Sequence, residues 1–418
     1  MSFLDSNQRF LAPDFDNSSV LALSSVIKKL EFELPLPLVE SKLISEKFRE
    51  IKNNFSVKNI VLLLVDSLGT ENIRETGILT NYLENNCIEV DCMFPSMTST
   101  NMASLSHLSY PGNHGLVGYN IYHEKINKIF NALNCQTVSD NGKEVTLAQL
   151  DLRKEDIIAG PSLPDQILNH STLCNQKINV EAWVPRSFDM TGLPRYLFGS
   201  ISPYQYEDMN PREMLQNIYH DLFNSQDLNV FVVYFPHTDY TSHLYTAQSP
   251  QYLASMKLLE TIIKALENHP TVGLGETAIV VTSDHGQVTL PKGDNRVAVS
   301  KKDVYYHNFL GFSIGTSGRA LHVYYDSEKG ERNAEEYLSQ YFSNSKNGII
   351  LDNNQASKLL GPKIENELYK KRLGEKVVLM DENFYLDYPE VVLYDGKEIL
   401  GQHGGMTKRE VKVPFFII

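Results

Sequence analysis

Three uninterrupted runs of apolar residues mark the chain, at residues 59–65 (NIVLLLV), 229–235 (NVFVVYF) and 277–281 (TAIVV). Such runs are typical of strands that are buried on both faces, as in a parallel sheet. Between the second and third runs, residues 250–268 carry apolar side chains at helical spacing, which predicts an amphipathic helix. A strand, a helix and a strand at this spacing form a βαβ unit. The pattern therefore predicts an α/β fold with a mostly parallel sheet flanked by helices.

The segments on either side of these runs have a different pattern. Residues 41–54 have helix-like apolar spacing, so we expect a surface helix packed on the sheet. After residue 287, polar segments rich in Gly and Lys alternate with short strand-like runs such as 320–325 and 376–380, and 335–342 is helix-like. We predict four parts: an N-terminal helical extension packed on the core (1–55), an α/β core (56–286), a smaller inserted α+β cap lobe (287–394) and a C-terminal return to the core (395–418).

Charge and composition narrow the classes of partner. The chain of 418 residues has 38 Lys and Arg against 51 Asp and Glu, a formal net charge of −13. This balance disfavours a nucleic-acid polymer, whose binding needs a basic face. The four cysteines include no CxxC pair, and the apolar runs are too short to span a bilayer. Since the first residues also lack an apolar signal segment, we expect a cytoplasmic protein with no membrane partner.

Each of the three predicted core strands runs into potential metal ligands. In open α/β sheets, sites form beyond the carboxyl ends of the strands. Mixtures of Asp and His suit zinc and, less specifically, manganese. The candidates are Asp66 after the first strand, Asp239 and His243 after the second, Asp284 and His285 after the third, and His403 in a GQHGG segment near the C-terminus.

The number and charge of these candidates point to two metal ions. Six ligands divide into two sets of three, and three carboxylates against two divalent ions leave a charge that one ionised hydroxyl would cancel. Each residue alone also has an ordinary explanation, because an Asp after a strand often caps a helix. Four such sites in chain order, three of them at strand ends, are harder to explain by capping.

Residues 94–115 (FPSMTSTNMASLSHLSYPGNHG) are rich in hydroxyl groups and follow the first strand unit. A Thr or Ser at a helix N-terminus can be ionised by nearby metal ions and by the helix dipole. Taken alone, the segment is more simply explained as a Ser/Thr-rich helix cap. Together with the candidate ligands, it indicates a nucleophile.

In this order the motifs resemble the alkaline phosphatase superfamily and, within it, the type I phosphodiesterase/nucleotide pyrophosphatase family. The resemblance covers residues 58–416 and implies an alkaline-phosphatase-like core with a cap lobe. The Cys-x-Pro-x-Arg motif that sulfatases of the same superfamily need is absent. The matching motifs are Asp66, the FPSMT segment, DYTSH at 239–243, SDHG at 283–286 and GQHGG at 401–405.

The resemblance also implies roles for individual residues. It makes Thr98 the nucleophile, with Asp239, His243 and His403 as ligands of one metal ion and Asp66, Asp284 and His285 as ligands of the other. The family usually places an Asn five residues after the histidine of the HG pair, where it stabilises a phosphoryl oxygen. Here that position is Tyr119, so the role could fall to Asn120, to Asn101 or to Tyr119 itself.

Substrate contacts are less closely defined. A near-neutral metal centre suits a singly charged diester, whereas a monoesterase usually adds a cation. Arg186, Arg195 and Arg319 are possible sources of that cation. Arg195 could line the pocket as a substrate-binding residue beside Tyr119, although a solvent-exposed Arg is the simpler expectation. His237 matches no family position but lies close enough in sequence to reach the site.

We therefore expect a hydrolase of phosphoric ester bonds, a metal-dependent phosphodiesterase or nucleotide pyrophosphatase. Its substrate would be a small phosphate ester, nucleotide-like, cleaved through a phosphothreonine intermediate with two divalent ions, zinc or manganese. The alternatives are a phosphomonoesterase or phosphonate hydrolase with the same centre, and a non-catalytic metal-binding homologue. The complete set of six ligands with Thr98 disfavours the last of these.

Overall fold

The structure is a computed structural model. It describes residues 9–28, 41–42, 44–46, 57–139, 142–175, 177–224, 227–291, 296–300, 303–304, 311–342, 347–364, 366–387, 393–394 and 397–418. Among these residues, no helix is both long and apolar enough to cross a membrane.

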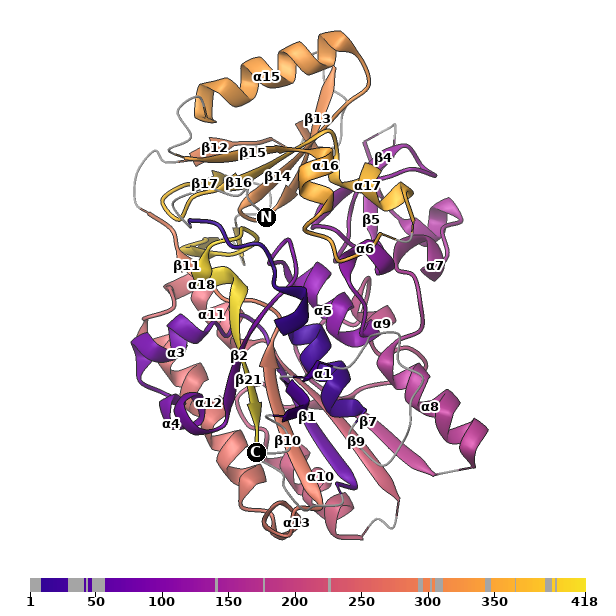
Figure 1. Cartoon of the computed structure of the whole chain (residues 1–418), viewed down its shortest axis with the longest axis vertical. Coiled ribbons are helices and arrows are strands. Elements are labelled where there is room, and N and C mark those ends of the chain that lie inside the picture. Colours follow the sequence, from indigo (N-terminus) through magenta and orange to yellow (C-terminus); the bar gives the residue numbers. More distant parts are fainter. Residues whose placement is uncertain are drawn as a thin grey trace.

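The lower body of the molecule in Figure 1 is built on a seven-stranded sheet. Five neighbouring strands run parallel, and β21 runs antiparallel to the strands on both sides of it. The mostly parallel sheet predicted from the apolar runs is thus confirmed. In spatial order the strands are β2 (Cys87–Asp91), β21 (Lys412–Ile417), β10 (Thr277–Ser283), β1 (Asn59–Val65), β9 (Leu228–Phe235), β7 (Ile178–Pro185) and β8 (Tyr204–Tyr206).

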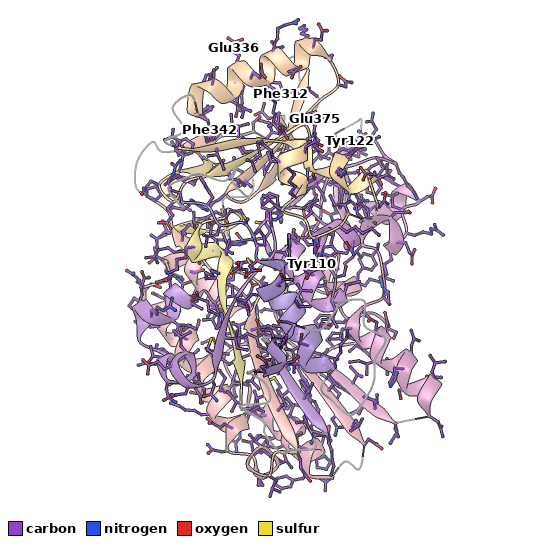
Figure 2. All side chains as sticks on the ribbon, in the orientation of Figure 1. Tyr110, Tyr122, Phe312, Glu336, Phe342 and Glu375 are labelled. Carbon is purple, nitrogen blue, oxygen red and sulfur yellow. The ribbon has the colours of Figure 1, made fainter. Side chains whose placement is uncertain are left out.

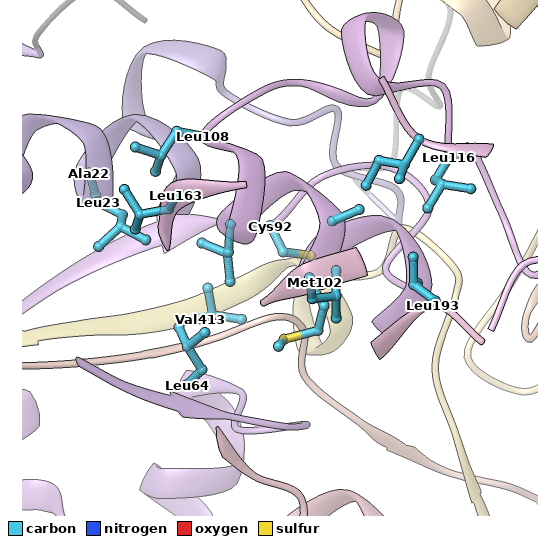
Figure 3. Close-up of a cluster of buried hydrophobic side chains, with 14 of the residues drawn as sticks. Ala22, Leu23, Leu64, Cys92, Met102, Leu108, Leu116, Leu163, Leu193 and Val413 are labelled. Carbon is cyan, nitrogen blue, oxygen red and sulfur yellow. The ribbon is translucent and has the colours of Figure 1, made fainter. Parts of the chain in front are cut away.

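The three apolar runs form the adjacent central strands β10, β1 and β9, and every residue in them is buried. Successive side chains of a strand point to opposite faces of the sheet. One strand therefore contributes side chains to two hydrophobic cores. Ile60, Leu62 and Leu64 belong to the core on one face, part of which Figure 3 shows around Leu64. Val61, Leu63 and Val65 belong to the core on the other face. Burial on both faces explains the uninterrupted apolar sequence.

Helices cover both faces of this sheet. The core that contains Leu64 includes side chains from α1 (Ser19–Ile27), α5 (Thr98–His107) and α8 (Leu163–Cys174). The opposite core includes side chains from α3 (Thr70–Thr76), α4 (Thr80–Asn85), α10 (Arg212–Asn224) and α12 (Pro250–Glu267). The predicted amphipathic helix is therefore confirmed as α12. The shorter helices are α6 (Pro111–His114), α7 (Lys154–Ile157), α9 (Pro194–Leu197), α11 (His237–Tyr245), α13 (Pro270–Gly273) and α18 (Lys408–Val411), with 3₁₀ turns at Phe15–Asn17 and Leu147–Leu150.

The upper part of the molecule contains an eight-stranded antiparallel sheet (Figure 1). Its order is β15 (Gly348–Asp352), β16 (Lys376–Met380), β14 (Ala320–Tyr325), β13 (Phe312–Ser317), β3 (Asn120–His123), β4 (Lys128–Asn131), β5 (Gln136–Val138) and β6 (Glu144–Thr146). Strands β3 to β6 come from a segment that the sequence patterns placed in the core. The sheet thus joins parts of the chain on both sides of residue 287, and the domain boundaries stay a prediction.

Helix α15 (Glu328–Phe342) packs on this second sheet. Phe312 of β13 and Phe342 of α15 share its hydrophobic core, whereas Glu336 lies on the exposed side of the helix (Figure 2). Helices α16 (Asn353–Ser357) and α17 (Leu368–Leu373) also lie in this part. Three two-stranded ladders complete the structure: β11 (Val288–Thr289) with β20 (Gly401–Gln402), β12 (Arg296–Ala298) with β17 (Tyr385–Asp387), and β18 (Leu393–Tyr394) with β19 (Lys397–Glu398). Most of the helix predicted at 41–54 lies outside the described residues.

Candidate metal centre and active site

The carboxyl ends of β1, β9 and β10 lie side by side at one edge of the parallel sheet. Asp66 follows β1 directly, α11 begins just after β9, and Asp284 follows β10. His403 follows β20, which pairs with β11 shortly beyond β10. The sheet topology therefore gathers side chains that are far apart in the sequence, as expected for the end of a parallel sheet.

Two groups of candidate metal-binding atoms meet at this edge. Asp66, Asp284 and His285 form the first group and Asp239, His285 and His403 the second, with the ligand atoms of each group within 4.8 Å of one another. Nε2 of His285 lies 3.5 Å from Oδ1 of Asp66 and 3.3 Å from Oδ2 of Asp284. The rings of His285 and His403 stack with their centroids 3.7 Å apart. His285 therefore lies at the junction of the two groups.

His243 joins the second group through Asp239. Its Nε2 lies 3.2 Å from Oδ1 of Asp239, and Nε2 of His403 lies 3.6 Å from the same oxygen. Asp239 and His243 are both in α11, so the predicted helical turn is confirmed. The sequence assigned His285 to one metal ion only, whereas the structure brings it close to both groups.

The three histidines are held in the same way, each by a bond between Nδ1 and a backbone carbonyl. Since a carbonyl oxygen only accepts, Nδ1 carries the proton and Nε2 presents its lone pair to the cluster, an arrangement typical of metal-binding histidines. The pairs are His243 with Gly401 (2.7 Å), His403 with Ser96 (2.8 Å) and His285 with Gly286 (3.0 Å).

Two of the carboxylates, Asp66 and Asp284, are each anchored at one oxygen. Tyr234 donates its hydroxyl to Oδ2 of Asp66, while the backbone N–H groups of Ser67 and His285 donate to Oδ1 of Asp284. The other oxygens, Asp66 Oδ1 and Asp284 Oδ2, are buried and have no hydrogen-bond partner among the described residues. Burial raises the pKa of both carboxyls, and repulsion between neighbouring carboxylates raises it further. Burial also raises the pKa of Asp239, but attraction to His243 and His403 outweighs it and lowers the pKa of that carboxyl. The part of the cluster around Asp66 and Asp284 is thus short of positive charge, which divalent ions at this position would supply.

Thr98 stands beside this cluster as the first residue of α5. Its Oγ1 lies 3.0 Å from Nε2 of His285. The N-cap residue, Met97, makes no side-chain capping bond, so the first-turn N–H groups lack an intrahelical or capping partner. The positive end of the helix dipole therefore favours an anion next to Thr98.

Asn101 holds the segment that leads into Thr98. Its Oδ1 accepts a hydrogen bond from the Met93 N–H at 2.6 Å. Its Nδ2 donates to the carbonyls of Met93, Pro95 and Met97 at 3.0–3.2 Å. The side chain does not border the cavity described next. The geometry thus supports a positioning role for Asn101 in place of the predicted contact with a phosphoryl oxygen.

A cavity of about 910 Å³ opens over the cluster. Thr98, Asp66, Asp239, His243 and His403 border it. Apolar and aromatic side chains from several elements make up much of the remaining wall, and none of the described residues that line it is Lys or Arg. The cavity is large enough for a small organic ester.

Comparison with known proteins shows which protein family the chain belongs to. Residues 60–406 match the family described as type I phosphodiesterase/nucleotide pyrophosphatase. The chain belongs to this family. It is accordingly a hydrolase of the phosphodiesterase/nucleotide pyrophosphatase type. Among curated proteins, none matches the chain significantly.

Solved structures of a phosphodiesterase and of a phosphonate hydrolase share its alkaline-phosphatase-like fold. Murine ectonucleotide pyrophosphatase/phosphodiesterase 5 is 15% identical, with a TM-score of 0.56 over 86% of this chain and 87% of the murine chain. An inactive variant of that enzyme has been solved in complex with AMP. Phosphonoacetate hydrolase from Sinorhizobium meliloti 1021, in complex with phosphonoformate, is 17% identical, with a TM-score of 0.57 over 87% of this chain and 91% of the hydrolase.

The predicted substrate contacts of this family member lie in different surroundings. Tyr119 borders the cavity, and burial raises the pKa of its phenol. Asn120 is buried and donates from Nδ2 to Oγ1 of Thr316 at 2.6 Å, without bordering the cavity. Arg195 is exposed on α9 and lies outside the cavity wall. Arg186 pairs with the exposed Glu207. Of these residues, only Tyr119 is placed to contact a bound substrate.

Two residues that support the candidate ligands were not predicted from the sequence. Tyr234 donates a hydrogen bond to Asp66. Because it is part of an apolar run, the sequence pattern predicts only a core residue at this position. Arg319 is fully buried, and its Nε donates to Glu410 at 2.9 Å. Glu410 also accepts from the Gly405 N–H at 2.8 Å, and the Arg319 N–H donates to the carbonyl of His403 at 2.9 Å. The buried pair thus supports the loop that carries His403.

Proposed function

We propose that this protein is a metal-dependent hydrolase of small phosphodiesters that acts through a covalent phosphothreonine at Thr98. One observation carries the proposal: Oγ1 of Thr98 lies 3.0 Å from Nε2 of His285, the residue common to both candidate metal groups. A nucleophile at this junction suits in-line displacement at phosphorus. The complex of AMP with an inactive threonine-to-alanine variant of the murine relative supports both the threonine and a nucleotide-type ligand.

The candidate ligands would hold two divalent ions, zinc being the metal that such a set of Asp and His suits best. Bound there, the ions would supply positive charge that favours loss of the Thr98 hydroxyl proton and departure of the leaving oxygen. The open N-terminus of α5 favours the anionic phosphoryl group beside Thr98. Oγ1 of Thr98 forms a bond to phosphorus as the bond from phosphorus to one alcohol breaks. Water then hydrolyses the phosphothreonine, which releases the phosphomonoester and restores the Thr98 hydroxyl.

The cavity wall favours a diester over a monoester. A phosphodiester carries one negative charge, whereas a phosphomonoester carries close to two at neutral pH and needs a further cation. The described lining includes Asp189 and Asp208 but no Lys or Arg. Arg319 cannot serve, because its guanidinium is buried against Glu410 and backbone carbonyls. The same argument ranks singly charged nucleotide diesters above nucleoside polyphosphates.

The decisive measurement is the ratio of kcat/KM on bis-p-nitrophenyl phosphate and p-nitrophenyl phosphate, with zinc and with manganese. We expect the diester to be favoured by at least about tenfold, the factor that about 1.4 kcal/mol of charge discrimination gives. Protein stripped of metal by a chelator is the control and should be inactive. Preference for the monoester would contradict the proposal and indicate a phosphatase.

A phosphonate hydrolase is the second candidate, because the fold of phosphonoacetate hydrolase matches this chain as closely as that of the murine enzyme. Phosphonoacetate carries a carboxylate in addition to its phosphonate, so its recognition calls for cations that the described cavity wall does not contain. We therefore expect no phosphate release from phosphonoacetate under conditions in which the diester is hydrolysed. Rapid release would make phosphonate hydrolysis the better assignment.

A further inference from the structure

Asp66 and Asp284 belong to the same candidate metal group, and in each carboxylate the two oxygens have different surroundings. Oδ2 of Asp66 accepts a hydrogen bond from the Tyr234 hydroxyl, and Oδ1 of Asp284 accepts from backbone N–H groups. Oδ1 of Asp66 and Oδ2 of Asp284, which we call the free oxygens, are buried and have no hydrogen-bond partner among the described residues. Nε2 of His285 lies 3.5 Å from the first and 3.3 Å from the second. The two free oxygens and the His285 nitrogen therefore lie together.

Tyr234 is held in place at both its ring and its backbone. It is the last residue but one of β9 and pairs with Leu64 of β1, two residues before Asp66. Its ring packs on Phe188 with ring centroids 4.8 Å apart, and its carbonyl accepts the Tyr206 hydroxyl at 2.9 Å. The residue is only 4% exposed. The Tyr234 hydroxyl is therefore a fixed donor to Oδ2 of Asp66.

These contacts leave the group three protein donor atoms for a metal ion, namely the free oxygens of Asp66 and Asp284 and Nε2 of His285. Three protein donors with one open position are typical of catalytic zinc, which is four-coordinate. Manganese and magnesium prefer about six ligands, most of them oxygen. A carboxylate that binds through both oxygens is one source of the extra ligand. At Asp66, such binding would compete with the hydrogen bond from Tyr234.

On the basis of the proposed metal-dependent function, we propose that Tyr234 is a positioning residue that restricts Asp66 to one donor oxygen and thereby favours zinc over manganese in this group. Zinc needs one oxygen from Asp66, so the hydrogen bond from Tyr234 costs zinc nothing. Manganese reaches the second oxygen of Asp66 only by breaking that bond. The corresponding oxygen of Asp284 is held mainly by backbone N–H groups, so Tyr234 is the restraint that a single substitution removes.

The test compares the unmodified protein with Tyr234→Phe, which removes the hydroxyl and keeps the ring on Phe188. The whole chain is stripped of metal, and its affinities for zinc and for manganese are measured by competition with a chromophoric chelator. We expect the ratio of zinc to manganese affinity to fall by at least about tenfold in one of the two binding steps, the order expected for a hydrogen bond to a charged group. A role in folding alone would lower both affinities by the same factor and leave the ratio unchanged.

Two control variants separate the carboxylate contact from other effects. Thr238→Val removes a different hydrogen bond to the same residue, because Thr238 donates from Oγ1 to the backbone carbonyl of Asp66. Tyr252→Phe removes a phenol that is equally buried, has no hydrogen-bond partner among the described residues and lies outside the cavity wall. Both variants should keep the metal ratio of the unmodified protein. An equal shift in Thr238→Val would assign the effect to the position of Asp66 and overturn the role of Tyr234.

Cobalt provides a spectroscopic measurement that does not depend on a variant. Bound in place of zinc, it absorbs visible light strongly when four-coordinate and weakly when six-coordinate, so the spectrum reports the number of ligands. We expect strong absorption in the unmodified protein and weaker absorption in Tyr234→Phe. Weak absorption in the unmodified protein would overturn the inference even if Tyr234→Phe did not fold.

The outcomes separate this inference from the proposed function, because the metal affinities are measured without substrate. An enzyme that hydrolyses bis-p-nitrophenyl phosphate but has the same metal ratio in Tyr234→Phe keeps its proposed function and loses the inference. A shifted ratio in a protein that hydrolyses neither nitrophenyl ester supports the inference and overturns the proposed function. Failure of the unmodified protein to bind either metal would overturn both.

Discussion

The two large sheets of this molecule border the same cavity but contribute to it differently. The parallel sheet supplies side chains with chemistry, since Asp66, Asp239 and Asp284 follow strands whose carboxyl ends meet at one edge. The antiparallel sheet has no such common edge, and near the candidate ligands it supplies mainly the turn between β13 and β14. Gly318 in that turn packs so closely on the His403 loop that a Cβ atom would stand 2.0 Å from the carbonyl oxygen of His403. The parallel sheet thus positions most of the candidate ligands, and the antiparallel sheet supports the loop that carries the last of them, His403.

The largest effect is expected at Thr98, the proposed nucleophile beside the edge of the parallel sheet. Replacing Thr98 with Ala should lower kcat/KM on the diester by at least about a thousandfold while the protein keeps its metal, because the nucleophile is lost and the candidate ligands stay. Steady-state kinetics and metal analysis of the same preparation measure both effects. Thr100→Ala, a buried position in the same helical turn, is the control and should retain activity. Unchanged turnover in T98A would remove Thr98 from the mechanism.

Metal content tests the ligands at the parallel edge. His243→Ala and Asp284→Ala should each lower the bound metal below that of the unmodified protein, since each removes a donor that nothing nearby replaces. Elemental analysis after reconstitution with zinc is the measurement, and the exposed His220→Ala serves as control. A chelator should abolish activity, and zinc or manganese should restore it. Full occupancy in both variants would rule out these two residues as ligands.

The bracing role of the second sheet predicts an effect on stability. Arg319→Met leaves Glu410 as a buried charge without its partner, which typically costs about 3–5 kcal/mol of unfolding free energy. Urea denaturation of the metal-free protein measures the loss. The control is Arg186→Met, whose partner Glu207 is solvent-exposed, and there we expect a change of about 1 kcal/mol or less. Equal losses at the two positions would show that the buried pair does not brace the loop.

The smallest effect is expected at Arg195, which lies outside the cavity wall. Replacing it with Ala should change kcat/KM on diester and monoester by less than about twofold, as for a surface substitution away from the site. Kinetics on both substrates would check this. A selective loss of monoester hydrolysis would instead return Arg195 to the substrate pocket and weaken the argument that the site lacks a cation.

The candidate ligands that follow the central strands could be predicted from the sequence. Burial on both faces gives each strand an unbroken apolar run, and the residue after the run lies at the carboxyl edge of the sheet. The helical turn of Asp239 and His243 follows from their spacing in the same way. Asn101 was not predictable, since its four hydrogen bonds depend on how the segment from Met93 to Met97 folds back on it. Sequence spacing shows that an amide lies near the nucleophile. It does not show that the hydrogen bonds of this amide are already made to the backbone.

Long-range pairing explains the other differences. Strands β3 to β6 are only three or four residues long, and they join the second sheet through β3, whose partner β13 lies far along the chain. No local pattern therefore links them to that sheet. The role of Arg319 depends on Glu410, likewise distant in sequence. Such contacts are properties of the topology rather than of any window of sequence.

The late position of His403 in the chain has a consequence for biosynthesis. His403 and strand β21, which lies between β10 and β2, come after all the other strands of both large sheets. At about 5–20 residues per second, the ribosome needs on the order of ten seconds to pass from His285 to His403. The nascent chain therefore spends that time with five candidate ligands made and the sixth missing. Loading of the complete centre is therefore a step that can only follow synthesis of His403.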